Sequence, residues 1–155
     1  MEPYLLVKTV HIISSTVLFG TGIGIAFFFL MGTRSGDPAA AWFAARTTAV
    51  ADMIFTLTAG LVQPISGLAL VHLTGVDPFA PWLAATYAIY AIALACWLPV
   101  VRLQLQIRDA YRARLDGATI DEALLARRIR TWFVLGWPAF VGLVIVFWLM
   151  VAKPI

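Results

Sequence analysis

Few side chains of this 155-residue sequence have the chemistry for ligand binding or catalysis, and several of them lie inside apolar segments. His11 lies well inside the first apolar segment, three residues after Lys8 and four residues before Ser15. Residues with these spacings share one side of a helix. A neutral imidazole can ligate haem iron or another metal, hydrogen-bond a neighbouring helix, or belong to a proton or ion pathway. All three interpretations of His11 stay open at this point.

A second set of polar residues follows one side of another apolar segment. At 100° per residue these positions fall together; they are Asp52, Thr56, Gln63 and Ser66. Pro64 interrupts the backbone hydrogen bonds of this segment and frees a carbonyl near its middle. We expect Asp52 and Gln63 to face other helices, with Arg102 as the partner of Asp52. The stripe is either interhelical polar packing or a second site.

Other side chains could complete a haem site around His11. His72 and Met150 lie at a similar depth and are candidates for the second axial ligand, although His72 points away from the polar stripe. Lys8 could pair with a haem propionate. The sequence contains no CxxCH attachment motif, so any haem would be held without covalent bonds. Nucleotide loops, HExxH pairs and Ser/His/Asp arrangements are absent too, and no catalytic residue can be assigned.

The composition excludes most classes of protein. Hydrophobic residues make up 62% of the chain and charged residues 12%, with a mean hydropathy of +0.92. Soluble domains average about 45–50% apolar and about 25% charged residues. Disordered chains need low hydrophobicity, and Cys96 alone cannot form an intrachain disulfide. The chain is therefore expected to be an integral membrane protein.

Four segments are long and apolar enough to cross a bilayer as helices. They cover residues 4–31, 51–73, 82–105 and 132–152, separated by breaks rich in Gly and Pro. The first segment lacks the short basic start and the cleavage site of a signal peptide, so we expect it to remain in the protein. The predicted fold is all-α, a single transmembrane domain over residues 1–155 that forms a four-helix bundle.

The arginines predict the orientation of this bundle. Nine Arg residues lie in or beside the 1–2 and 3–4 loops, whereas only Lys8 and Lys153 lie near the other side. The positive-inside rule then places both termini outside and an Arg-rich 3–4 hairpin in the cytoplasm. The hairpin is either a plain extension of two helices or a site for lipid or a protein partner. Since the basic residues flank apolar segments, the net charge of +3 does not indicate nucleic-acid binding.

Three glycines are expected at close helix contacts. Gly20 and Gly24 form a small-xxx-small pair, and Gly67 follows the polar stripe. Small residues let helices approach where hydrocarbon provides no hydrophobic force. The Gly20–Gly24 pair would pack inside the bundle or at a dimer seam.

Several motifs resemble a bacterial integral membrane family known as domain of unknown function 2269. They are Tyr4-Leu-Leu-Val-Lys-Thr-Val-His11, Phe19-Gly-Thr-Gly22, Ala51-Asp-x-x-Phe-Thr56, Gln63-Pro-x-x-Gly67, Trp97-Leu-Pro-Val-Val-Arg-Leu-Gln104 and Trp137-Pro138. The resemblance covers essentially the whole chain and implies four spans in the bacterial cytoplasmic membrane.

The Lys8-x-x-His11 opening and the glycine-rich first span are also similar to the HemJ-type membrane haem proteins. In that family the first-span histidine is associated with haem b, which implies the same role for His11. The third span lacks the lysine of the HemJ-type pattern, so the oxidase activity itself is not carried over.

Two classes of function follow. One is a small membrane b-type haem protein for electron transfer or porphyrin-linked redox. The other is a non-enzymatic subunit that stabilises a homodimer or a larger membrane complex. Whether the chain is an enzyme stays open.

Overall fold

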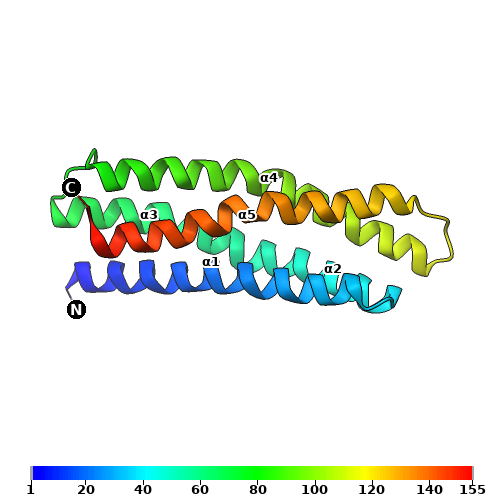
Figure 1. The fold of residues 1–155 in the computed structure, drawn as a ribbon. Helices are drawn as coiled ribbons and strands as arrows, with labels where there is room; N and C mark the ends of the chain where they lie inside the picture. The colour runs from blue at the N-terminus through cyan, green and yellow to red at the C-terminus, as the bar shows by residue number, and fades with distance from the viewer. Residues whose placement is uncertain (1, 155) are drawn as a thin grey trace.

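The computed structural model describes residues 2–154, and this part of the chain contains helices and no strand (Figure 1). Five α-helices and one π-helical turn follow each other: α1 (Pro3–Arg34), α2 (Pro38–Ala51), η1 (Asp52–Thr56), α3 (Leu57–Thr74), α4 (Pro81–Leu115) and α5 (Glu122–Ala152). α2, η1 and α3 form one continuous helical segment of 37 residues. Four helical segments are thus long and apolar enough to span a membrane, which confirms the predicted all-α fold.

Local sequence explains where these helices begin and end. Proline occupies the first turn of α1, α2 and α4, where its missing N–H costs no hydrogen bond. Asp37 and Asp121 cap α2 and α5, each by accepting a backbone N–H with its side chain. Gly75 ends α3 in the left-handed region, with φ of 67°, a conformation that glycine adopts without steric cost. Capping and turn residues therefore set the three connections.

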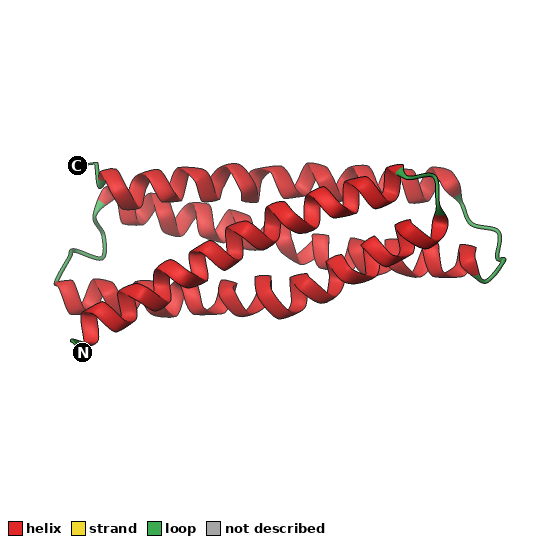
Figure 2. Cartoon of the chain, turned by 90° about the horizontal axis from the view of Figure 1, so that it is seen from below, coloured by secondary structure: helices red, strands yellow, loops and turns green. Residues whose placement is uncertain are grey.

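The helices are longer than a membrane is thick. The four helical segments have 32, 37, 35 and 31 residues, or about 46–56 Å at 1.5 Å per residue, against a hydrocarbon core of about 30 Å. Both termini lie at one end of the bundle and the loops 35–37 and 116–121 at the other (Figures 1 and 2). The Arg-rich region between the third and fourth spans is an extension of α4 and α5, as one of the two sequence interpretations predicted.

The sequence interpretation began the second span at residue 51 and missed a helix before it. Residues 38–51 form α2, which continues the second span toward the arginine-bearing end. Five alanines between Ala39 and Ala45 explain its stability, because alanine has the highest helix propensity. The side chains of Ala41, Ala44 and Ala45 are buried and let α2 approach its neighbours.

The best-packed core lies toward the arginine-bearing end of the bundle. It contains buried side chains from α1, α2, α4 and α5: Phe29, Ala41, Ala45, Val100, Ile107, Tyr111, Leu125 and Trp132. The Phe29 ring packs against the Trp132 ring at a tilt, with ring centroids 4.7 Å apart. Beyond the hydrocarbon, water again drives apolar burial, whereas lipid provides no such force between helices. A core concentrated at this end is the expected consequence.

Glycine packing differs from the sequence prediction. An added Cβ at Gly20 or Gly24 would meet no described atom within 4 Å, so neither lies at a close contact within the bundle. Gly67 does, because its Cβ would lie 3.3 Å from His11 Cε1. The tightest glycines are two that the sequence did not single out. A Cβ on Gly32 would overlap Ala44 Cβ and lie 3.1 Å from the Ala40 carbonyl oxygen, and one on Gly142 would lie 2.7 Å from a methyl carbon of Ile89.

We predict that Gly32→Ala lowers the free energy of unfolding in mixed micelles by about 1–3 kcal/mol, because α1 and α2 must separate to admit the methyl group. Gly20→Ala is the matched control and should be neutral or stabilising by roughly 0.5–1 kcal/mol, since alanine is the better helix former. Denaturation followed by circular dichroism measures both. Equal effects of the two substitutions would contradict the packing described above.

The topology is tested by reporter fusions. Alkaline phosphatase should be active when it is fused after the C-terminus and inactive when it is inserted in the loop 116–121, because the nine arginines lie at the loop end. The reverse pattern would show that both termini face the cytoplasm.

Candidate functional site

His11 joins α1 to α3 through a defined hydrogen-bonded arrangement. Its Nδ1 lies 2.8 Å from Ser66 Oγ, and the Ser66 hydroxyl donates to the Val62 carbonyl at 2.6 Å. A serine hydroxyl has a single proton. We assign to His11 the tautomer with the proton on Nδ1, because the ring then donates to Ser66 while the Ser66 hydroxyl donates to Val62. In this tautomer Nε2 carries the free lone pair. Among the described residues no hydrogen bond reaches Nε2, so this nitrogen is available to a ligand.

Two neighbours fix the His11 segment further. The Gln63 side-chain amide donates to the His11 carbonyl at 2.7 Å and to Ser14 Oγ at 2.6 Å. Gly67 lies against the edge of the imidazole, where a Cβ would come within 3.3 Å of Cε1. Gln63 thus faces another helix as predicted, and the structure shows that this helix is α1, which Ser66 also contacts. The ring of His11 therefore has little freedom to rotate.

Pro64 has the predicted effect on α3. Proline cannot donate to the carbonyl four residues earlier, which is that of Gly60. The Tyr90 hydroxyl on α4 donates to this freed oxygen and joins the two helices. The sequence did not single out Tyr90 as a site residue, and the only sequence signal for its role is the carbonyl that Pro64 leaves without a backbone partner.

Asp52, the first residue of the π-helical turn within the second helical segment, is the centre of a second polar cluster. The residue is 2% exposed and accepts hydrogen bonds from Trp97 Nε1, at 3.2 and 3.1 Å to its two oxygens, and from Gln104 Nε2 at 2.8 Å. The amide oxygen of Gln104, Oε1, accepts a hydrogen bond from Trp132 Nε1 on α5 at 3.4 Å. These contacts connect the second span to α4 and α5, and they confirm that Asp52 faces other helices.

The expected pair between Asp52 and Arg102 is wrong. Arg102 is exposed and forms none of the ion pairs found among the described residues. Trp97 and Gln104 are seven residues apart and share one side of α4, whereas Arg102 lies about 200° around the helix from Gln104. A carboxylate at this depth is therefore stabilised by neutral donors.

Thr56 ends the π-helical turn that begins at Asp52, and its Oγ1 is buried without a hydrogen-bond partner in the described structure. π-helical turns often occur at functional sites. The predicted stripe lies on the inward side, but its members do not form one site. Asp52 contacts α4 and Gln63 and Ser66 contact α1, while Thr56 lies between them.

The other candidate ligands are not brought against His11. Lys8 is exposed, with Nζ 5.4 Å from the centre of the Tyr4 ring. His72 is exposed and lies six residues beyond Ser66, which is about 9 Å along α3 and about 240° around it. Met150 is partly buried near the end of α5. Within residues 2–154, no cluster of three His, Cys, Asp or Glu side chains could hold a metal ion.

Comparison with known proteins identifies the family. The sequence model described as "Predicted integral membrane protein (DUF2269)" matches residues 5–154. The chain belongs to the DUF2269 family. Comparisons with curated proteins and with solved structures give no match. The DUF2269 match agrees with the resemblance seen in the sequence motifs and describes an integral membrane protein without assigning it an activity. The four apolar helices indicate that the chain crosses the membrane several times.

For this DUF2269 protein, we predict that Asp52→Ala lowers the free energy of unfolding by about 2–4 kcal/mol. Loss of the acceptor leaves the Trp97 and Gln104 donors unpaired, at about 1–3 kcal/mol each. Asp109→Ala is the matched control and should cost about 0–1 kcal/mol, because Asp109 is exposed and pairs with Arg108 at the surface. Denaturation in mixed micelles measures both. Equal losses would show that the buried cluster is not a stabilising contact.

Proposed function

We propose that this chain is a small membrane haem protein in which His11 Nε2 is an axial ligand of a b-type haem. One observation carries the proposal: Nδ1 of His11 lies 2.8 Å from Ser66 Oγ, and in the tautomer assigned above the Nε2 lone pair is directed away from that contact. Ligating histidines regularly donate their other N–H to a protein acceptor, which fixes the tautomer and raises the basicity of the ligand. His11 and Ser66 have this relation.

The residues around His11 fit such a ligand. Gly67 packs against the imidazole edge, and Gln63 holds the backbone of the same turn of α1. A ligand whose ring is already oriented loses little conformational freedom when it binds. His11 is only partly buried, so its ring is not sealed inside the bundle.

Bound haem would supply one-electron redox chemistry, which suits electron transfer or a porphyrin-linked reaction. The chain would contribute the axial nitrogen of His11 and, through Ser66, its orientation. Lys8 lies one turn closer to the outer end of α1 and offers a cation for a propionate. His72 and Met150 remain the candidates for a second ligand.

The proposal is tested by the visible spectrum of protein that is expressed with ample haem supply. Wild-type protein should show a Soret band and His11→Ala should lose it. Ser66→Ala should keep the ligand but weaken haem affinity by about 10–100-fold, the usual effect of removing such a hydrogen-bond partner. His72→Ala is the matched control and should retain haem, with a changed spin state only if His72 is the second ligand.

Colourless wild-type protein would overturn the haem proposal and favour the second candidate, a non-enzymatic subunit of a homodimer or larger membrane complex. A specific observation supports that candidate. Gly20 is exposed, and neither it nor Gly24 has a described neighbour within 4 Å of an added Cβ. This small-xxx-small pair is thus left open to another helix. Haem-free protein that purifies with a tightly bound partner would identify this role.

A further inference from the structure

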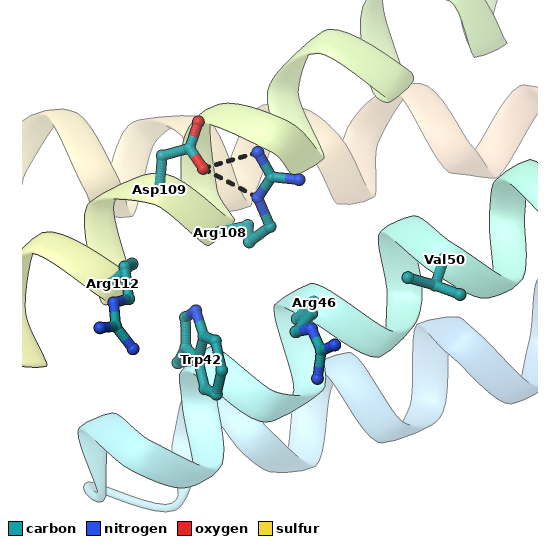
Figure 3. Close-up of a pocket in the computed structure, with 6 residues that line it drawn as sticks. All are labelled: Trp42, Arg46, Val50, Arg108, Asp109 and Arg112. Carbon is teal, nitrogen blue, oxygen red and sulfur yellow. Dashed lines mark hydrogen bonds and ion pairs between the residues drawn. The ribbon is translucent and has the colours of Figure 1, made fainter.

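A pocket of about 340 Å³ lies between α2 and α4 at the arginine-bearing end of the bundle (Figure 3). His11 lies in the first half of α1, toward the end that holds the termini. Its walls combine basic, aromatic and apolar side chains: Trp42, Arg46, Val50, Arg108, Asp109 and Arg112. By the positive-inside rule, this end of the bundle faces the cytoplasm. The pocket therefore lies at the level of the cytoplasmic membrane surface.

Two of the three arginines of the pocket lie over one indole ring. Trp42 lies between Arg46 and Arg112 (Figure 3), whose guanidinium carbons are 5.7 and 5.6 Å from the ring. Arg46 is exposed and forms none of the ion pairs found in residues 2–154. Its charge is thus held at the pocket by stacking and has hydrogen-bond donors to spare.

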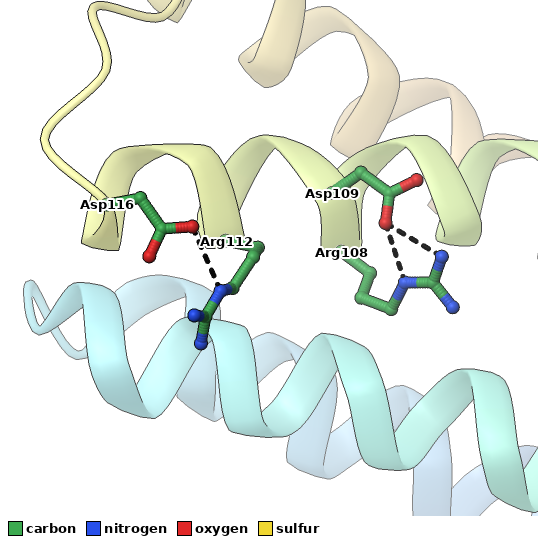
Figure 4. Close-up of polar contacts among 4 residues, drawn as sticks. All are labelled: Arg108, Asp109, Arg112 and Asp116. Atoms are coloured by element: carbon green, nitrogen blue, oxygen red, sulfur yellow. Dashed lines mark hydrogen bonds and ion pairs between the residues drawn. The ribbon is translucent and has the colours of Figure 1, made fainter.

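The other two arginines are oriented by carboxylates of their own helix (Figure 4). Arg108 pairs with Asp109 at 2.7 Å, and Arg112 pairs with Asp116 at 3.0 Å. Each guanidinium uses one side for its carboxylate and keeps further N–H groups free. Three arginines against two carboxylates leave an excess of one positive charge, which an anion at the pocket would compensate.

Toward the membrane centre the same helix faces become apolar. On the second span, Trp42 and Arg46 are followed at four-residue steps by Val50 and Ile54, which are 50% and 54% exposed. On α4, Leu105 and Leu98 continue the side of Arg112, and they are 37% and 60% exposed. This surface is thus basic at the pocket and apolar along the helix faces that continue from it toward the membrane centre. A phospholipid has the same arrangement in its leaflet, with the headgroup at the surface and the acyl chains toward the centre.

We propose that this pocket binds the phosphate headgroup of an anionic phospholipid of the cytoplasmic leaflet. The phosphate contacts Arg46 and Arg112 beside Trp42, and an acyl chain lies along Val50. Basic pockets between transmembrane helices on this side suit anionic lipid headgroups, and tryptophan is favoured at the membrane surface. A free phosphate would use the arginines but not the exposed apolar faces that continue the pocket, which favours the lipid.

The test compares lipid binding by purified protein in a neutral detergent, measured by native mass spectrometry and by thermal protection. Phosphatidylglycerol should bind more tightly than phosphatidylcholine of the same chain length. Arg46→Gln should weaken phosphatidylglycerol binding about fivefold, the effect expected for one cation at an anionic surface. Since Arg46 has no ion pair to lose and its contact with Trp42 is exposed, the substitution should lower the unfolding temperature without lipid only slightly. Arg127→Gln removes an equally exposed charge from α5, outside the pocket, and should bind as the wild type does.

Three results would overturn the proposal. One is equal binding of the two lipids by the wild-type protein. Another is an equal loss in the Arg46 and Arg127 variants, which would indicate diffuse charge attraction. The third is full protection by glycerol 3-phosphate alone at the same concentration, which would assign the pocket to a soluble phosphate. The assay gives the same readout in His11→Ala protein, so its outcome is independent of haem.

Discussion

In hydrocarbon, no hydrophobic force drives apolar helices together. This constraint explains where the contacts between the helices of this protein are found. Inside the apolar spans, the helices are joined by hydrogen bonds between polar side chains and freed backbone groups, including His11 to Ser66, Gln63 to the His11 carbonyl and Tyr90 to the Gly60 carbonyl. Each of these hydrogen bonds satisfies polar groups that would have no hydrogen-bond partner in lipid. Toward the arginine-bearing end, where water returns, an apolar core of ordinary character forms around Phe29 and Trp132.

The same constraint makes the polar contacts directional, and so they place functional groups as well as hold helices together. Ser66 orients the ring of His11 through the 2.8 Å contact between its Oγ and Nδ1. The hydrogen bond that joins α1 to α3 therefore also determines which imidazole nitrogen stays free. A structural role and a ligand role for His11 are compatible, since they use different atoms of one ring.

The Asp52 cluster lies between the part of the bundle that is joined by polar hydrogen bonds and the part that has an apolar core. The π-helical turn begins at Asp52, and the carboxylate reaches Trp97 and Gln104 on α4. Beyond it toward the loops, the helices carry the arginines and the pocket around Trp42. The haem proposal and the lipid proposal thus concern opposite ends of the bundle, and the buried cluster separates them.

The sequence by itself determined the four spans, the shared end of the two termini, the inward side of the second span and the carbonyl that Pro64 frees. These follow from hydropathy and helical period, which depend on each residue and its near neighbours. Only the tertiary structure decided the partners. Periodicity showed that Asp52 faces inward but could not distinguish Trp97 and Gln104 from Arg102, because that choice depends on how α4 is rotated. Nor could periodicity show that Gly32 is tightly packed and Gly20 is not. A glycine has no side chain whose polarity would indicate whether it faces lipid or another helix.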